Sequence, residues 1–325
     1  MKKIDAHIHF AADEPESLGI LQENDLKLLN ICVATSGPHP WREQAETYRR
    51  LIEEDPARFA WCTSFDLPRF DDPQYIEKVL EDLDRDFAAG AIACKVWKNI
   101  GMEVLAPSGA FLMPDDPLLD PIYLHITARN KALLMHIAEP LACWQPLDER
   151  NPHYGYYSKH PEWHMYGKSG MPSHSELIQA RDNVLARHPE LRIIGAHLGS
   201  LEYDVQEVAN RFERFPNFAV DISARLADIA FQDTATVRQF FLDYQDRILF
   251  GTDLVSPLSM ADQPTEQRER KLAYFKQSYR EHFQYLETED TFEMLGREVQ
   301  GIGLPPEVLE KVYYTNALRW YPGIE

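Results

Sequence analysis

Residues 4–10 read Ile-Asp-Ala-His-Ile-His-Phe, a short run in which two histidines stand one residue apart. The run is typical of a β-strand, whose side chains alternate between the two faces. We therefore expect Asp5, His7 and His9 to lie on one face of the strand. Two neutral imidazoles on one face can bind a single cation, and zinc is a common partner. The same spacing also occurs in surface or hydrogen-bonded histidines, so the motif alone leaves both interpretations open.

The rest of the chain alternates similar apolar runs with amphipathic stretches. The expected strands are residues 4–10, 29–35, 59–65, 91–97, 132–138, 192–197, 218–222 and 248–253. The expected helices between them are residues 40–54, 73–89, 121–130, 173–188, 203–215 and 234–244. Eight strands that alternate with helices predict an α/β fold, a closed (β/α)8 TIM barrel. An open doubly wound sheet is the alternative, but no GxGxxG follows any of these strands.

The length of 325 residues fits one barrel with insertions, and we expect a single domain spanning residues 1–325. Three long loops, residues 99–120, 140–172 and 254–303, follow the fourth, fifth and eighth strands. Barrel enzymes build their active sites from loops at this end of the strands. The last loop contains a helical stretch at residues 266–286, and a final helix over residues 306–320 is expected to close the barrel from outside.

Composition narrows the classes of function. The formal net charge of −19 disfavours binding to nucleic acid, whose phosphates would be repelled. The four cysteines form no CxxC pair, which favours buried, reduced thiols. We find neither a leader-like apolar segment at the amino terminus nor an apolar run long enough to span a membrane. We therefore expect a cytoplasmic protein that acts on a small molecule, without a membrane or nucleic-acid partner.

Ionisable residues stand at the ends of several of the expected strands. They are His7 and His9, Lys95, His136, His197 and Asp253, from the first, fourth, fifth, sixth and eighth strands. A buried parallel strand is almost entirely apolar, so a polar residue at its end needs a ligand, a metal or a partner. Because the strand ends of a barrel converge on one mouth, these residues predict a divalent metal site, with zinc as the expected ion.

The chemistry of these groups indicates their roles. A divalent metal held by the two first-strand histidines and further side chains lowers the pKa of bound water. Asp253 can bind the metal and also carry a proton from that water to a leaving group. His197 can be a ligand or can polarise a carbonyl oxygen, and His136 is a further ligand. Lys95 is either a free amine or a carboxylated, anionic bridge, so one metal or two can be bound.

Other polar and aromatic residues near the strand ends are candidates for substrate binding. They are Trp97 and Lys98 after the fourth strand, Glu139 after the fifth, and Arg225 after the seventh. Lys98 and Arg225 could clamp a carboxylate, or each could form a salt bridge within its loop. Trp163 belongs to the aromatic-rich loop after the fifth strand, where it could stack on a substrate ring or pack within the loop itself.

Together these segments resemble the amidohydrolase superfamily, and within it the amidohydrolase-related family, which includes lactonases, decarboxylases and a hydratase. The resemblance covers nearly the whole chain. It is carried by DAHIH at 5–9, MHIAEP at 135–140, GAHLGS at 195–200, FGTD at 250–253 and YTNALRWY at 314–321. It implies site roles for His7, His9, His136, His197 and Asp253. CKVWKNIG at 94–101 resembles the lysine segment of two-metal members, whereas many amidohydrolase-related proteins use one metal and no carbamate.

The residues and the resemblance predict a metal-dependent hydrolase. Metal-activated water would attack a small ester, lactone or amide that carries a carboxylate, and Asp253 would move the proton. The alternative enzyme is a metal-dependent non-oxidative decarboxylase that releases carbon dioxide from a small carboxylic acid. A barrel that kept only a binding or scaffold role would have lost a ligand, but all five expected positions are filled. The resemblance also implies a homodimer, as members of the family often pair.

Overall fold

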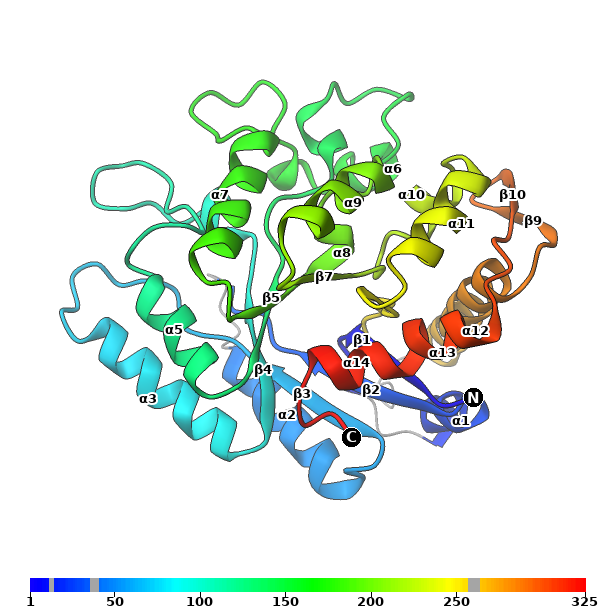
Figure 1. The fold of residues 1–325 in the computed structure, drawn as a ribbon, viewed down its shortest axis with the longest axis horizontal. Coiled ribbons are helices and arrows are strands. Elements are labelled where there is room, and N and C mark those ends of the chain that lie inside the picture. The colour runs from blue at the N-terminus through cyan, green and yellow to red at the C-terminus, as the bar shows by residue number, and fades with distance from the viewer. Residues whose placement is uncertain (12–14, 36–40, 257–263) are drawn as a thin grey trace.

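Parallel strands form one sheet, in which each strand neighbours the next along the chain (Figure 1). The computed structural model describes residues 1–11, 15–35, 41–256 and 264–325. The strands are β1 (Lys3–Ile8), β2 (Leu26–Ile31), β3 (Phe59–Thr63), β4 (Ala91–Val96), β5 (Ala132–Met135), β6 (Arg192–Gly195), β7 (Phe218–Asp221) and β8 (Ile248–Leu249). The predicted TIM barrel is confirmed, and β2 begins three residues earlier than the expected run at residue 29.

Helices cross between successive strands, as parallel pairing requires. They are α1 (Pro15–Glu23), α2 (Trp41–Glu54), α3 (Tyr75–Ala88), α5 (Asp120–Ala128), α7 (His174–Arg187), α9 (Val205–Arg214) and α11 (Thr234–Asp243). Shorter helices lie in the loops: α4 (Asn99–Met102), α6 (Tyr154–Tyr157), α8 (Ala196–Gly199) and α10 (Leu226–Ala230). The sequence analysis missed α1, and residue 40, where the first predicted helix begins, lies outside the described residues.

The barrel closes between β1 and the residues that follow β8. The amide of Asp253 donates to the carbonyl of His7 at 2.7 Å, and the amide of His9 donates to the carbonyl of Leu254 at 2.9 Å. Strand β8 pairs with β7 only through Ile248 and Leu249, so it is shorter than the expected strand at residues 248–253. The backbone instead turns toward β1, and Asp253 adopts a left-handed conformation with φ of 60°. This closure brings the first and last strands of the barrel into contact.

Side chains from alternate strand positions fill the barrel interior. This inner cluster includes Ile4, Ala6, Leu29, Ile31, Ala60, Cys62, Ile92, Ala132, Leu134, Ile194 and Leu249. The same cluster contains Trp320, Tyr321 and Ile324 from the end of the chain, together with residues near the starts of several strands. The carboxyl terminus therefore covers the amino-terminal end of the barrel. The expected final helix at residues 306–320 is confirmed, as α13 (Pro306–Glu310), a π-helical turn (Lys311–Thr315) and α14 (Asn316–Trp320) that follow one another without a break.

A β-bulge in β1 decides which way its polar side chains face. The register of β1 with β2 shifts between Asp5 and Ile8, so the simple alternation of faces breaks there. His7 and His9 both face Asp253. Asp5 faces outward, contrary to the expected common face, and its carboxylate accepts a hydrogen bond from the hydroxyl of Tyr279 at 2.9 Å. Because of the bulge, the histidines of β1 face Asp253 while Asp5 of the same strand bonds to Tyr279.

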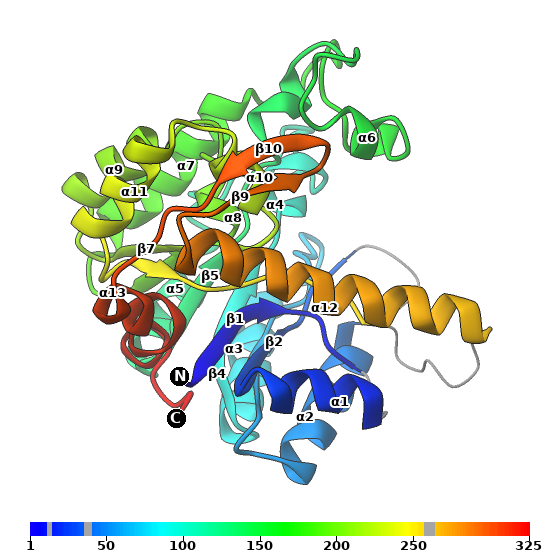
Figure 2. The same ribbon diagram turned by 90° about the vertical axis from the view of Figure 1, so that its right-hand side faces the viewer.

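The loop after β8 adds a long helix and a hairpin to the barrel. Helix α12 (Thr265–Glu287) confirms the predicted helical stretch, although residues 257–263 of the loop lie outside the described residues. The hairpin of β9 (Thr291–Met294) and β10 (Arg297–Gln300) was not predicted. Figure 2 shows α12 crossing beside β1, where Tyr279 reaches Asp5. Among the described residues, every helix is too short or too polar to cross a bilayer.

The bond between Tyr279 and Asp5 leads to a stability prediction. Asp5 is fully buried, and burial raises its pKa to about 6 although hydrogen bonds from Thr252 and Tyr279 favour the ionised form. Tyr279→Phe removes one donor from this carboxylate and should lower the free energy of unfolding by about 1–3 kcal/mol, measured by chemical denaturation. Tyr274→Phe, at an exposed position of the same helix, is the control. Equal stability of the two variants would contradict the prediction.

Candidate metal centre

Three of the predicted ligands converge at the carboxyl-terminal mouth of the barrel. The Nε2 atom of His7 lies 3.6 Å from Oδ1 of Asp253, and the Nε2 atom of His9 lies 3.2 Å from the same oxygen. Donor atoms about 2.1 Å from a tetrahedral zinc ion stand about 3.4 Å from one another. Both measured separations are close to this value, so the donor set fits a divalent ion without rearrangement of the backbone.

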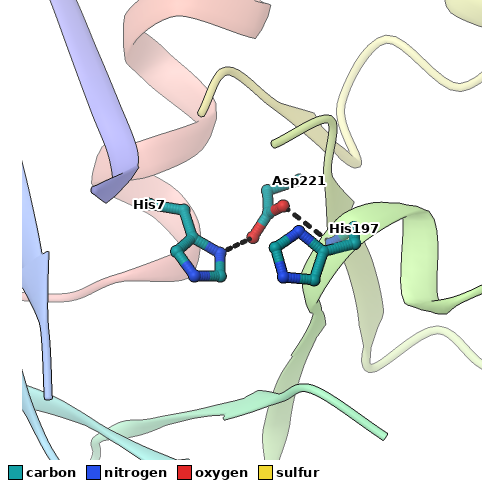
Figure 3. Close-up of side chains that lie close together, drawn as sticks. All are labelled: His7, His197 and Asp221. Atoms are coloured by element: carbon teal, nitrogen blue, oxygen red, sulfur yellow. Dashed lines mark hydrogen bonds and ion pairs between the residues drawn. The ribbon is translucent and has the colours of Figure 1, made fainter. Parts of the chain in front are cut away.

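The side chain of His7 is held in one orientation by Asp221. Its Nδ1 atom donates to Oδ2 of Asp221 at 2.9 Å (Figure 3). The Nε2 atom therefore carries the lone pair, and it faces Asp253. A carboxylate that accepts from the distal nitrogen is the usual support for a metal-binding histidine. Both side chains are fully buried. Gly251 allows the close approach, because a Cβ there would stand 3.1 Å from that of His7.

Asp221 also fixes the loop that carries His197. Its Oδ1 atom accepts from the amide of His197 at 2.9 Å and from the hydroxyl of Ser223 at 2.5 Å. Burial alone would raise the pKa of Asp221, but the His7 ring, the His197 ring and the Ser223 hydroxyl outweigh burial and lower the pKa to about 2. The carboxylate therefore stays ionised while it holds residues from β1, β6 and β7 together.

His197 presents a free lone pair toward the same centre. The residue follows β6 with a left-handed φ of 58°, and its Nδ1 atom donates to the carbonyl of Ser223 at 2.9 Å. Burial lowers the pKa of His197 to about 3, so the ring is neutral and Nε2 is an acceptor. This atom lies 3.8 Å from Oδ2 of Asp253. The arrangement suits a ligand better than a hydrogen-bond donor to a carbonyl oxygen.

The remaining predicted ligands stand beside this group. The Nζ atom of Lys95 lies 3.1 Å from Nε2 of His7, and burial lowers the pKa of its amine. A neutral amine or a carbamate would tolerate a nearby cation better than an ammonium group. The ring of His136 meets that of His197 edge to face at 4.4 Å between centroids. His136 is not part of the compact groups of donor atoms found among the described residues.

The charges around Asp253 favour its ionised form. Burial raises the pKa of this carboxyl, but the neighbouring imidazoles of His197, His9 and His7 reverse the effect and hold it well below the ordinary value. Its side chain is 28% exposed, whereas those of His7 and His197 are almost completely buried. Asp253 is therefore an anionic group that faces both the imidazoles and the mouth of the barrel.

Four of the residues proposed to bind substrate form a second cluster. Lys98 makes an ion pair with Glu139 and lies over the ring of Trp163, 3.9 Å from its centroid. The rings of Trp97 and Trp163 meet at 5.4 Å between centroids. Glu139 also accepts a hydrogen bond from the hydroxyl of Tyr157 at 3.1 Å. Lys98 has therefore already found a carboxylate partner within its own surroundings.

Arg225 stands apart from this ion pair. It directly precedes α10 and is 9% exposed, and it forms no ion pair with the described residues. Burial mainly sets the pKa shifts of His197 and Lys98, and the positive charge of Arg225 further lowers both pKa values. Arg225 is therefore close to the candidate metal centre and remains available to an anion.

Comparison with known proteins places the chain in a family. A profile described as amidohydrolase matches residues 4–323. The chain belongs to the amidohydrolase family. No curated protein matches its sequence closely enough to add a more specific relative.

Solved structures of low sequence identity share the amidohydrolase fold. A TIM-barrel protein from Bordetella bronchiseptica has a TM-score of 0.58 at 13% identity, covering 100% of this chain and 99% of that one. A dihydroxybenzoic acid decarboxylase from Polaromonas sp. JS666, with bound manganese and 2-nitroresorcinol, has a TM-score of 0.52 at 18% identity over 98% and 96%. A 4-oxalomesaconate hydratase from Rhodopseudomonas palustris has a TM-score of 0.52 at 12% identity over 95% and 80%.

Two residues of this candidate site make contacts that the sequence analysis did not predict. Asp221 and Ser223 lie at the end of β7, but they bond to His7 and His197 rather than face a substrate. The signal was present as a polar pair, Asp-Ile-Ser, at the end of an apolar run. Sequence alone could not show that these side chains turn inward to support two imidazoles from other strands.

The support of His7 by Asp221 predicts a loss of metal affinity in Asp221→Asn. The amide would no longer hold the Nδ1 proton as an anion does, so the affinity for zinc should fall about 10–100-fold, measured by competition with a chromogenic chelator. Asp243→Asn, an exposed change on α11, serves as the control. An unchanged zinc affinity in a folded Asp221→Asn protein would show that the carboxylate does not support the centre.

Removing a predicted ligand should have a larger effect. His7→Ala should abolish stoichiometric metal, measured by elemental analysis after dialysis, because two of the three converging donors cannot hold the ion alone. His160→Ala, a substitution of an exposed histidine in the loop after β5, should keep the full metal content. Circular dichroism would check that both variants are folded. Full metal content in His7→Ala would remove His7 from the ligand set.

Proposed function

We propose that this amidohydrolase is a metal-dependent hydrolase that acts on a small ester, lactone or amide bearing a carboxylate. One observation carries the proposal: Nε2 of His7 and Nε2 of His9 both meet Oδ1 of Asp253 at ligand-like separations. These groups come from opposite ends of the chain and meet at the mouth of the barrel. A metal-dependent hydrolase needs a set of metal-binding side chains beside an accessible proton acceptor.

The proposed ion is held by His7, His9 and Asp253, with His197 and His136 as further ligands. Zinc suits this set of imidazole and carboxylate donors, although manganese is bound in one structural neighbour. When bound, a divalent ion lowers the pKa of water and polarises a carbonyl oxygen. The fixed Nδ1 contacts of His7 and His197 leave both Nε2 atoms as acceptors, which is the form that binds a metal.

We assign the proton transfer to Asp253. Its carboxylate is ionised, partly exposed and 3.2 Å from His9, so it is placed to take a proton during the reaction and to return it to a leaving group. No other carboxylate shares this position among those proposed for the site, since Asp221 is completely buried under His7 and His197.

Binding of a substrate carboxylate is assigned to Arg225. The Lys98 ammonium is paired with Glu139, so Arg225 is the better candidate for an anion. A guanidinium suits a carboxylate because it can donate two parallel hydrogen bonds. Trp97 and Trp163, with Lys98 and Glu139, form the adjoining wall, where aromatic faces can contact the apolar part of the substrate.

A substrate panel tests this function. Metal-loaded protein is incubated with lactones, esters, amides and aromatic acids, and the release of acid is compared with the release of carbon dioxide. We expect release of acid without carbon dioxide, and a loss of about 10²–10⁴-fold in turnover for Asp253→Asn. Glu190→Gln, at an exposed position, is the control. Release of carbon dioxide instead would establish the alternative, a metal-dependent decarboxylase.

The number of metal ions depends on the state of Lys95. The proposed ligands His7, His9 and Asp253 form one compact set of donors, so we expect one equivalent of metal per chain, unchanged by bicarbonate, when the purified protein is analysed for its metal content. A second equivalent that appears with bicarbonate and disappears in Lys95→Gln would instead indicate a carboxylated lysine bridging two ions. Lys131→Gln, a substitution outside the site, controls for the loss of a lysine.

A further inference from the structure

Two buried polar atoms at the mouth of the barrel have no hydrogen-bond partner among the described residues. They are Nε of Arg225 and Oε2 of Glu202. Arg225 is 9% exposed and Glu202 is 2% exposed, so bulk water does not satisfy these atoms. An unsatisfied buried donor or acceptor is costly to keep, and the cost is greater for charged groups. A pair of such atoms with opposite character indicates a place for a polar ligand.

Both residues lie in loops at the proposed active-site end of the barrel. Arg225 follows β7, and Glu202 follows β6 and α8. The other carboxylate oxygen of Glu202, Oε1, accepts from the amide of Leu141 at 2.9 Å, which anchors it to the start of the loop after β5. The side-chain amide of Gln232 donates to the carbonyl of Glu202 at 2.7 Å and to that of Asp228 in α10 at 3.1 Å, so the Glu202 loop lies against the helix that Arg225 precedes. Burial raises the pKa of Glu202, and the positive charge of Arg225 acts against this rise.

Neither charge is neutralised by its surroundings. No ion pair joins Arg225 to Glu202 within the described part of the chain, and the neighbouring Lys98 is paired with Glu139. Arg225 instead donates from Nη1 to the carbonyl of Ala224 at 2.8 Å, which leaves Nε free. An ionised carboxylate only accepts hydrogen bonds, and a guanidinium only donates them. The unpaired groups are therefore one donor, Nε of Arg225, and one acceptor, Oε2 of Glu202.

We propose that Arg225 and Glu202 form a subsite for a hydroxy acid. The carboxylate of the ligand lies against Arg225, and its hydroxyl donates to Oε2 of Glu202. An ammonium group would suit Glu202 as well, but the positive charge of Arg225 disfavours a second cation there. This inference rests on the proposed function, in which Arg225 binds the substrate carboxylate beside the metal centre. In this subsite Glu202 discriminates between hydroxylated and plain carboxylic acids.

Matched pairs of acids test the subsite by titration calorimetry on the metal-loaded protein. The pairs are mandelate with phenylacetate, lactate with propionate, and 2-hydroxybenzoate with benzoate, and the members of each pair differ by one hydroxyl. We expect the hydroxylated member of at least one pair to bind about tenfold more tightly or better, because its hydroxyl donates to a charged acceptor. Arg225→Gln should weaken the binding of both members.

Glu202→Gln should remove most of that preference while it leaves the affinity for the plain acid unchanged, because a neutral amide oxygen is a weaker acceptor. Glu202→Asp, which keeps the charge but shortens the side chain, is a second variant in case the amide disturbs folding, and it should also lose the preference. Glu190→Gln is the matched control at an exposed site. Thermal unfolding of each variant establishes that it is folded.

The subsite is wrong if the unaltered protein shows no hydroxyl preference in any pair, or if a folded Glu202 variant keeps it. An ordered water that satisfies Glu202 would give this result. The proposed function fails separately, through the absence of metal or of metal-dependent acid release in the substrate panel. Hydrolysis without a hydroxyl preference would therefore overturn the subsite alone.

Discussion

The carboxylate of Asp221 is the contact on which the candidate centre depends. One oxygen holds Nδ1 of His7, and the other holds the amide of His197 and the hydroxyl of Ser223. Residues from β1, β6 and β7 are therefore fixed by a single buried group. Because the group is completely enclosed, it holds the His7 ring directly and the His197 backbone through its amide, while the carbonyl of Ser223 accepts from the His197 ring.

The closure of the barrel supplies the second constraint. The backbone bond from Asp253 to His7 is part of the seam between the first strand and the residues after the last one. Asp253 lies beyond the end of β8 with a left-handed backbone, and its carboxylate faces His9. The same seam that completes the fold thus sets the distance between a ligand and the proposed proton carrier. A change in barrel closure would change the metal centre as well.

Opposite charges in the surrounding loops are only partly paired. Lys98 and Glu139 neutralise each other beneath the ring of Trp163, whereas Arg225 and Glu202 each retain a free polar atom. A buried ion pair stabilises a protein only if its geometry is good, whereas a buried polar atom without a partner lowers the stability of the fold. This contrast separates a structural wall from the surface that we propose to recognise a ligand.

The sequence by itself determined the eight strands of the barrel, most of the helical stretches between them and the polar residues at the strand ends. These features are local, because the period of apolar residues and the point at which it stops are visible in the chain. Only the tertiary structure decided how those residues face. The bulge in β1 turned Asp5 outward to Tyr279, and the hairpin at residues 291–300 turned through Leu295 and Gly296 without a strong turn sequence.

The division between ligands and supporting groups was also invisible in the sequence. Asp221 and Asp253 both end apolar runs, yet one is enclosed beneath the imidazoles and the other is open to the mouth of the barrel. Lys98 and Arg225 are both cations after strands, yet only Lys98 finds a carboxylate among the described residues. Pattern identifies a residue type at a strand end, but its partner comes from another strand, so its role is set by packing.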